Sequence, residues 1–185
     1  MSKSLKTIQT FSKIGRIIAK ICFILSIIGS IGCLIAILSI VGTKDLEFEG
    51  QTMVGIIEAT GVTFVTVVFD CFQGLISCIG SAVLSKFAVN YFTNELDDGT
   101  PFTYNGAKEI FRLGILSIAI PTGISIVLGT AFTVTKLFWP PLDDNALISE
   151  SISLTTGLLL IVMSFVFRHG AEIAERTQSD NTINL

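Results

Sequence analysis

The segment Ile21–Thr43, ICFILSIIGSIGCLIAILSIVGT, contains no charged residue and decides the fold class. Three further runs are similar in length and character, and single acids interrupt two of them, Asp70 in the second run and Glu150 in the fourth. These runs are Ala59–Ser85, Leu113–Thr135 and Ala146–Phe167. About 20 helical residues cross the roughly 30 Å hydrocarbon core of a bilayer. The sequence therefore predicts four membrane-spanning helices.

We expect an all-α membrane protein, a four-transmembrane-helix bundle that forms one membrane domain over residues 1–185. An amphipathic N-terminal extension precedes the first span, and a helical C-terminal tail follows the last one. The predicted spans cover about 19–43, 59–85, 111–136 and 147–168. The middle loop is expected at 86–110, and the outer loops at 44–58 and 137–146.

The composition excludes several other classes of protein. The chain has 185 residues, of which 50% are hydrophobic and 15% charged, and its mean hydropathy is +0.74. A net charge of −3 gives no basic footprint for direct nucleic-acid binding. Four cysteines lie inside the first two runs without the close pairing of a zinc site, so we expect small buried hydrophobes and no metal or cofactor. They are Cys22, Cys33, Cys71 and Cys78.

The basic residues predict the orientation. Ten of the twelve flank the runs on one side, and only Lys44 and Lys136 lie on the other. Basic residues gather in cytoplasmic segments of membrane proteins, so we expect both termini and the middle loop in the cytoplasm. The ten residues are Lys3, Lys6, Lys13, Arg16, Lys20, Lys86, Lys108, Arg112, Arg168 and Arg176.

Each predicted span carries small or polar residues along one face at helical spacing. Large apolar side chains such as leucine are as stable against lipid as between helices. The places where membrane helices pack closely are therefore marked by small residues, which let the backbones approach. Helix packing is the preferred interpretation, and a lined cavity or proton path is the alternative. The faces include Cys22, Ser26, Gly29, Ser30 and Cys33; Thr63, Thr66, Gln73, Gly74, Ser77 and Ser81; Ser117, Pro121, Ser125 and Gly129; and Ser153, Gly157 and Ser164.

Asp70 is the strongest candidate for an intramembrane polar site, together with Thr66, Gln73 and Ser77 on the same helix face. A carboxylate near the middle of a span costs free energy unless it is solvated, paired or protonated. We expect Asp70 to point into the bundle, where Thr66 or Gln73 could hydrogen-bond it. A structural acid and a proton-carrying acid both fit this pattern.

Two short segments resemble a known family. The middle loop has Glu95–Thr103, ELDDGTPFT, and the end of the fourth span has Phe165–Ile173, FVFRHGAEI, followed by Ser179–Ile183, SDNTI. With four spans, this pattern resembles the YoaS-like family of small, uncharacterised bacterial membrane proteins over nearly the whole chain. The residues of this cytoplasmic motif are Asp97, Asp98, Gly99, Pro101, Phe102, Arg168, His169, Gly170 and Glu172.

The resemblance implies a bacterial cytoplasmic membrane and no known activity. It also implies a small helix-turn-helix regulator as a partner, because genes for the two often neighbour each other in that family. Other partners that we expect are the lipid bilayer itself, another membrane protein or a second copy of the chain.

The residues of the motif also predict a local structure. Asp97-Asp98-Gly99 favours a turn, and Thr103 favours the start of a helix that runs through Arg112. We expect the turn to pack against the tail, with Arg168 close to Asp97 or Asp98, although arginines here could also meet phosphates.

No catalytic motif is present. His169 is the only histidine, and it lies at the predicted membrane edge, away from a buried nucleophile. There is no His-Glu-x-x-His, no phosphate-binding loop and no Gly-x-Gly-x-x-Gly. We therefore expect a non-enzymatic membrane protein that is regulatory or protective and acts through partners. The alternatives are a small proton-linked transporter or channel that uses Asp70, and an accessory subunit of a larger membrane complex.

Overall fold

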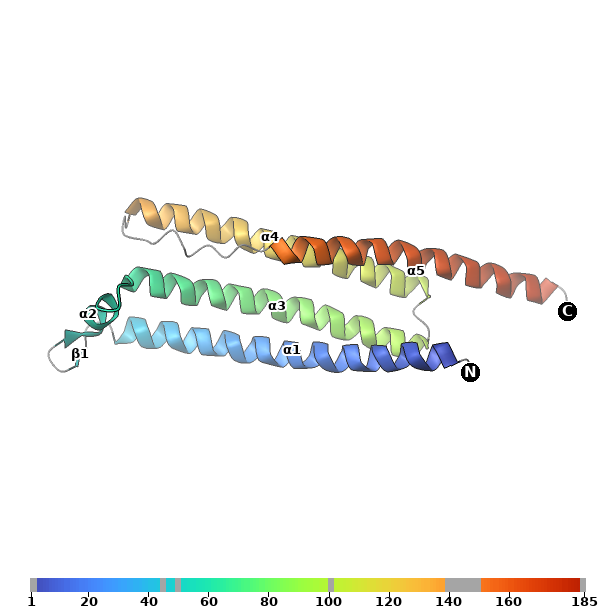
Figure 1. The fold of residues 1–185 in the computed structure, drawn as a ribbon, viewed down its shortest axis with the longest axis horizontal. Coiled ribbons are helices and arrows are strands. Elements are labelled where there is room, and N and C mark those ends of the chain that lie inside the picture. Colours follow the sequence, from blue (N-terminus) through green and yellow to red (C-terminus); the bar gives the residue numbers. More distant parts are fainter. Residues whose placement is uncertain (1–2, 44–45, 49–50, 100–101, 139–150, 184–185) are drawn as a thin grey trace. The chain divides into compact units, whose positions relative to one another are not determined.

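The computed structural model describes residues 3–43, 46–48, 51–99, 102–138 and 151–183. Its long helices have apolar segments that are long enough to cross a membrane. The prediction of four long apolar helices is therefore confirmed. They are α1 (Lys3–Gly42), α3 (Phe64–Asp98), α4 (Tyr104–Phe138) and α5 (Ser151–Ile183), shown in Figure 1.

The segment between α1 and α3, predicted as the outer loop 44–58, has short elements of its own. It contains an antiparallel pair of short strands, β1 (Glu47–Phe48) and β2 (Gln51–Thr52), and a short helix α2 (Met53–Glu58). The Thr52 hydroxyl accepts a hydrogen bond from the backbone N–H of Gly55 at 3.2 Å and caps α2.

The second long helix also begins later than predicted. We expected it from residue 59, but α3 starts at Phe64. Gly61 lies before it with φ +84°, a left-handed conformation that glycine adopts without steric cost and that interrupts a helix. The predicted start of the fourth span, at 147, lies outside the described residues.

The long helices are longer than a bilayer requires. They contain 40, 35, 35 and 33 residues, and at 1.5 Å per residue each is roughly 50–60 Å long. The hydrocarbon core takes only about 30 Å of that length. The predicted N-terminal extension is continuous with α1, and the predicted tail is continuous with α5.

The chain divides into two compact units. Unit 1 comprises residues 1–23, 83–120 and 151–185, and unit 2 comprises residues 24–82 and 121–150. Helices α1, α3 and α4 contribute to both units, and α5 belongs to unit 1. Within α4 the boundary falls at Pro121, the residue that cannot donate a backbone hydrogen bond.

Unit 2 is held together by small residues and one aromatic pair. A Cβ at Gly29 would lie 2.9 Å from Sγ of Cys78, and one at Gly74 would lie 3.3 Å from Sγ of Cys33. The rings of Phe69 and Phe132 meet edge to face at 5.5 Å. The predicted packing of the first two runs through small residues is therefore seen between α1 and α3.

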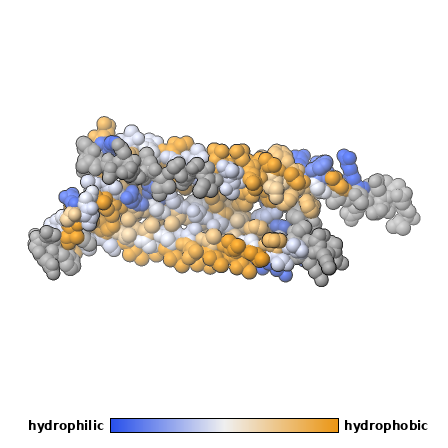
Figure 2. Space-filling view, viewed as in Figure 1, coloured by the Kyte–Doolittle hydropathy of each residue, from blue (hydrophilic) through white to orange (hydrophobic). Residues whose placement is uncertain are grey.

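In unit 1 the backbones of α4 and α5 come close together. A Cβ at Gly157 would lie 2.9 Å from the carbonyl oxygen of Gly114 and would also contact Cγ1 of Ile118. Large apolar side chains such as Leu158 remain exposed on the outside of the helices. Figure 2 shows hydrophobic residues over much of the visible surface of the long helices, with hydrophilic residues gathered towards their ends.

Candidate functional site: the polar hairpin of unit 1

We use the name polar hairpin for residues 86–98 at the end of α3, the connecting residues 99 and 102–103, and residues 104–112 at the start of α4. Its turn is built by two local devices. Gly99 ends α3 in a left-handed conformation, φ +72°, and its N–H donates to the Glu95 carbonyl at 3.1 Å. Thr103 then caps α4, because its hydroxyl accepts the Gly106 N–H at 3.0 Å. The predicted cap at Thr103 is present. Of the predicted Asp97-Asp98-Gly99 turn, only Gly99 leaves the helix, because Asp97 and Asp98 are the last residues of α3, and α3 and α4 extend through most of the predicted loop 86–110.

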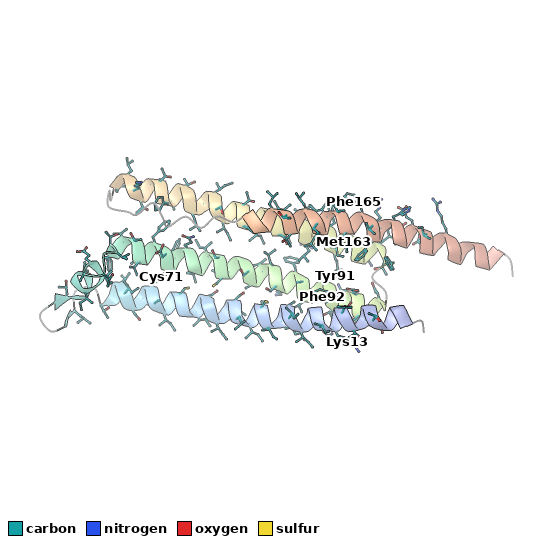
Figure 3. All side chains as sticks on the ribbon, viewed as in Figure 1. Lys13, Cys71, Tyr91, Phe92, Met163 and Phe165 are labelled. Carbon is teal, nitrogen blue, oxygen red and sulfur yellow. The ribbon has the colours of Figure 1, made fainter. Side chains whose placement is uncertain are left out.

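Helix α1 is attached to the polar hairpin by side-chain hydrogen bonds. The buried Ser12 hydroxyl donates to Oε1 of Glu95 at 2.8 Å, and Nε2 of Gln9 donates to the Gly99 carbonyl at 3.4 Å. The ring of Phe92 covers Gly15, where a Cβ would lie 2.6 Å from Cζ of the ring. Figure 3 shows Phe92 and the neighbouring Tyr91 on α3. The hairpin is therefore fixed against α1.

A polar cleft lies between the two arms of the hairpin. It consists of two adjoining pockets of about 360 Å³ and 280 Å³, which share Asn94, Glu109 and Arg112. Three carboxylates and two cations line it, so the cleft presents both signs of charge. The remaining lining residues are Phe87, Asn90, Tyr91, Asp97, Asp98, Asn105 and Lys108.

The side chains of this cleft are held in place by their neighbours. Nδ2 of Asn94 donates to Oε1 of Glu109 at 2.6 Å, across the two arms. The second carboxylate oxygen of Glu109 is buried and has no hydrogen-bond partner among the described residues. The Arg112 guanidinium stacks over the Phe87 ring at 4.9 Å from its centroid. These contacts hold an amide, a carboxylate and a guanidinium in fixed positions along the cleft.

The tail meets the loop through an aromatic residue. Phe102 lies against Gly170, where a Cβ would be 2.6 Å from Cδ1 of the ring, and stacks edge to face on Phe167 at 5.5 Å. The expected pairing of Arg168 with Asp97 or Asp98 is wrong among the described residues. Nε of Arg168 instead pairs with Glu172 at 3.7 Å, one helical turn along α5.

The other motif residues have local partners. Oδ2 of Asp98 accepts a hydrogen bond from the Thr103 hydroxyl at 3.2 Å, beside the cap. Nδ1 of His169 lies 3.9 Å from Oε2 of Glu172, and its side chain is exposed. Asp97 is exposed at the rim of the cleft, and Pro101 lies outside the described residues.

A second pocket lies between α4 and α5. It has a volume of about 300 Å³ and opens beside the hairpin in unit 1. Its lining combines two cations with two phenyl rings, and we call it the α4–α5 pocket. The lining residues are Ala107, Lys108, Phe111, Ser164, Phe165 and Arg168.

The predicted intramembrane polar site lies in unit 2. Asp70 is exposed there, so the expected enclosure of its side chain by helix faces is not seen within that unit. The buried Thr66 hydroxyl pairs with that of Thr63 at 2.6 Å. Gln73 and Ser77 are half-buried. Among the described residues, neither Thr66 nor Gln73 hydrogen-bonds Asp70.

Sequence reasoning missed Asn94 and Glu109 in the cleft. It also missed the pairing of Ser12 with Glu95, which attaches α1 to the hairpin. A signal was available for the first two, because amides recur at positions 90 and 94 near the end of one arm. Glu109 and Arg112 lie one turn apart on the facing arm. No comparable signal marks Ser12.

The comparisons with known proteins add no family. No family model, curated protein or solved structure matches this chain. Within the part of the chain that the structure describes, no group of three or more His, Cys, Asp and Glu side chains is arranged to hold a metal ion. The resemblance to YoaS-like proteins stays a prediction.

Proposed function

We propose that this chain is a multi-pass protein of a bacterial cytoplasmic membrane, non-enzymatic, that regulates or protects through partners bound at the polar hairpin. The observation that carries the membrane part of the proposal is the set of four helices that are long and apolar enough to cross a membrane, and the charged cleft of the hairpin supports the binding of partners. Water would otherwise contact a large apolar surface on each of them.

The charge distribution supports both termini and the polar hairpin on the cytoplasmic side. The hairpin is held by α1 and by hydrogen bonds between its arms, so its cleft is organised before a partner arrives. Binding is weakened when side chains and loops must become ordered at the interface, and a cleft that is already organised avoids much of that free-energy cost. A cleft with both signs of charge can bind the polar surface of a partner protein. That partner is a small helix-turn-helix regulator, another membrane protein or a second copy of the chain.

The orientation can be tested with single cysteines. A cysteine at Glu58, the exposed last residue of α2, should react with a membrane-impermeant maleimide added to intact cells. One at Asp97, exposed on the hairpin, should react only after the cells are opened. The four native cysteines lie in apolar segments, and the unmodified chain gives the background. Labelling of position 97 in intact cells would contradict the proposed topology.

A proton-linked transporter or channel is the second candidate, and the exposure of Asp70 in an apolar helix favours it. A carboxylate facing hydrocarbon is costly, so water, a proton or another polar group must compensate it in a membrane. Within unit 2, Lys136 is the only cation among the described residues. A proton-accepting role for Asp70 fits this arrangement.

Two substitutions separate the candidates. In a strain that lacks the native chain, Asp97→Lys should lose the ability to restore the wild-type transcript profile, because it reverses a charge at the cleft. Asp70→Asn should restore that profile fully, since the amide has the size of the protonated acid. The opposite result, with Asp70→Asn inactive and Asp97→Lys active, would support transport and contradict the regulatory function.

A further inference from the structure

The α4–α5 pocket has a cationic lining, and it shares Lys108 with the polar cleft. Lys108 and Arg168 are both exposed, and none of its six lining residues is a carboxylate. The hydroxyl of Ser164 is occupied, because it donates to the Ile161 carbonyl at 2.6 Å. The polar groups that face this pocket are therefore mainly cationic, and they favour an anion.

Asp97, Asp98 and Glu109 line the polar cleft together with Lys108, and the acid that pairs with Arg168 is Glu172. Its carboxylate lies 3.7 Å from Nε of Arg168, but the two side chains are 40% and 64% exposed. Ion pairs in such solvated positions contribute little net free energy. A guanidinium can bind a phosphate, as it binds a carboxylate, through two parallel hydrogen bonds. Glu172 is a weak competitor for a phosphate ligand.

The wall of the pocket is apolar. The rings of Phe111 and Phe165 meet edge to face at 6.2 Å, and they remain 38% and 58% exposed. Figure 3 shows Phe165 on α5, near Met163. Exposed rings beside two cations favour a ligand that joins a negative group to an apolar chain.

The position of the pocket along the helices identifies the source of such a ligand. Arg168 directly follows the last apolar run, and Lys108 precedes the third run by five residues. At 1.5 Å per residue this places both cations within about 8 Å of the ends of the apolar segments. In a membrane-inserted chain that is the layer of the lipid headgroups.

We propose that the α4–α5 pocket binds one anionic phospholipid. Its headgroup phosphate lies between Lys108 and Arg168, and the first carbons of an acyl chain lie along Phe111 and Phe165. Basic pockets between membrane helices are typical sites for anionic headgroups. This inference rests on the proposed insertion in a membrane and adds a specific ligand to it.

The test measures lipid retention on the full-length protein. The chain is reconstituted in phosphatidylcholine vesicles that contain a minor share of phosphatidylglycerol, extracted mildly, and weighed by native mass spectrometry. Phosphatidylglycerol should stay bound in preference to phosphatidylcholine. Lys108→Gln and Arg168→Gln should each weaken its retention about fivefold, the effect of one cation near an anionic headgroup.

Matched variants separate binding from folding. Lys13→Gln removes an exposed cation from α1, outside the pocket, and should leave retention unchanged. Lys108→Arg and Arg168→Lys keep the charge and should retain the lipid. Glu172→Gln frees Arg168 of its acidic neighbour and should increase retention, which a merely structural role of these residues would not produce.

Three results would overturn the inference. The first is equal retention of phosphatidylglycerol and phosphatidylcholine. The second is a loss of phosphatidylglycerol retention in Lys13→Gln as large as that in the pocket variants. The third is that inorganic phosphate protects the chain against thermal unfolding as well as phosphatidylglycerol vesicles do. Cysteine labelling of the same preparations shows whether the chain has inserted. A chain that inserts but has no lipid preference contradicts only this inference, whereas a chain that fails to insert contradicts the proposed function.

Discussion

Gly157→Leu should destabilise the folded chain by about 3 kcal/mol, the upper part of the usual range for forcing bulk into a packed site. A Cβ at this position would lie 2.9 Å from the Gly114 carbonyl oxygen and against Cγ1 of Ile118. The contact is reciprocal, because a Cβ at Gly114 would lie 3.0 Å from the Gly157 carbonyl oxygen. A backbone carbonyl cannot rotate away as a side chain can, so α4 and α5 would have to separate.

Unfolding by denaturant in detergent micelles measures this effect, followed by loss of helical circular dichroism. Gly157→Ala should give a smaller loss in the same direction. Gly123→Leu is the matched control, since a Cβ at Gly123 in α4 would meet no heavy atom of the described residues outside its own helix turn within 4 Å. Equal stability of the Gly157→Leu and Gly123→Leu chains would show that α4 and α5 do not approach closely at position 157.

Hydropathy predicted the long helices well because a run of apolar residues has few structural alternatives. It could not predict the short elements between α1 and α3. Those depend on single hydrogen bonds, such as the one from the Gly55 N–H to Thr52, and on the left-handed conformation of Gly61. Such local terms do not change the average apolarity of a segment, so the start of α3 was placed too early.

The small-residue faces show what periodicity leaves open. Gly157 was expected to pack closely, and it does, but its partner Gly114 lies one heptad before Pro121, beyond the predicted face. Gly129, which belongs to that face, has no heavy atom within 4 Å of a Cβ position. Periodicity identifies the direction in which a helix packs, whereas the position of the contact along the helix depends on the neighbouring helix.

In the candidate site, too, local features could be predicted from the sequence and long-range contacts could not. The turn at Gly99 and the cap at Thr103 were predictable, because both devices act within a few residues. The bond between Ser12 and Glu95 joins positions 83 residues apart, and no local pattern encodes it. The predicted charge contact of Arg168 with Asp97 or Asp98 was wrong because Glu172, one turn away on α5, is the nearer acid.

The same long-range bond gives the second large effect. Glu95→Ala should destabilise the chain by about 2–3 kcal/mol, since hydrogen bonds to charged groups contribute roughly 1.5–3 kcal/mol. Ser12 would lose an acceptor at 2.8 Å, and the buried Tyr91 would lose its side-chain hydrogen bond with Glu95. Buried hydroxyls that lose an acceptor keep their cost of desolvation. The free energy of unfolding of the purified chain in detergent measures the change.

Asp97→Ala is the control, because this carboxylate lies two residues further along α3 and is exposed. Its removal should change the free energy of unfolding by less than about 0.5 kcal/mol, as for most surface substitutions. Ser12→Ala should give a smaller loss than Glu95→Ala, and the double variant should lose less than the sum of the two, since both changes remove one shared bond. Strict additivity would show that Ser12 and Glu95 are not coupled and that α1 is not attached to the polar hairpin through this pair.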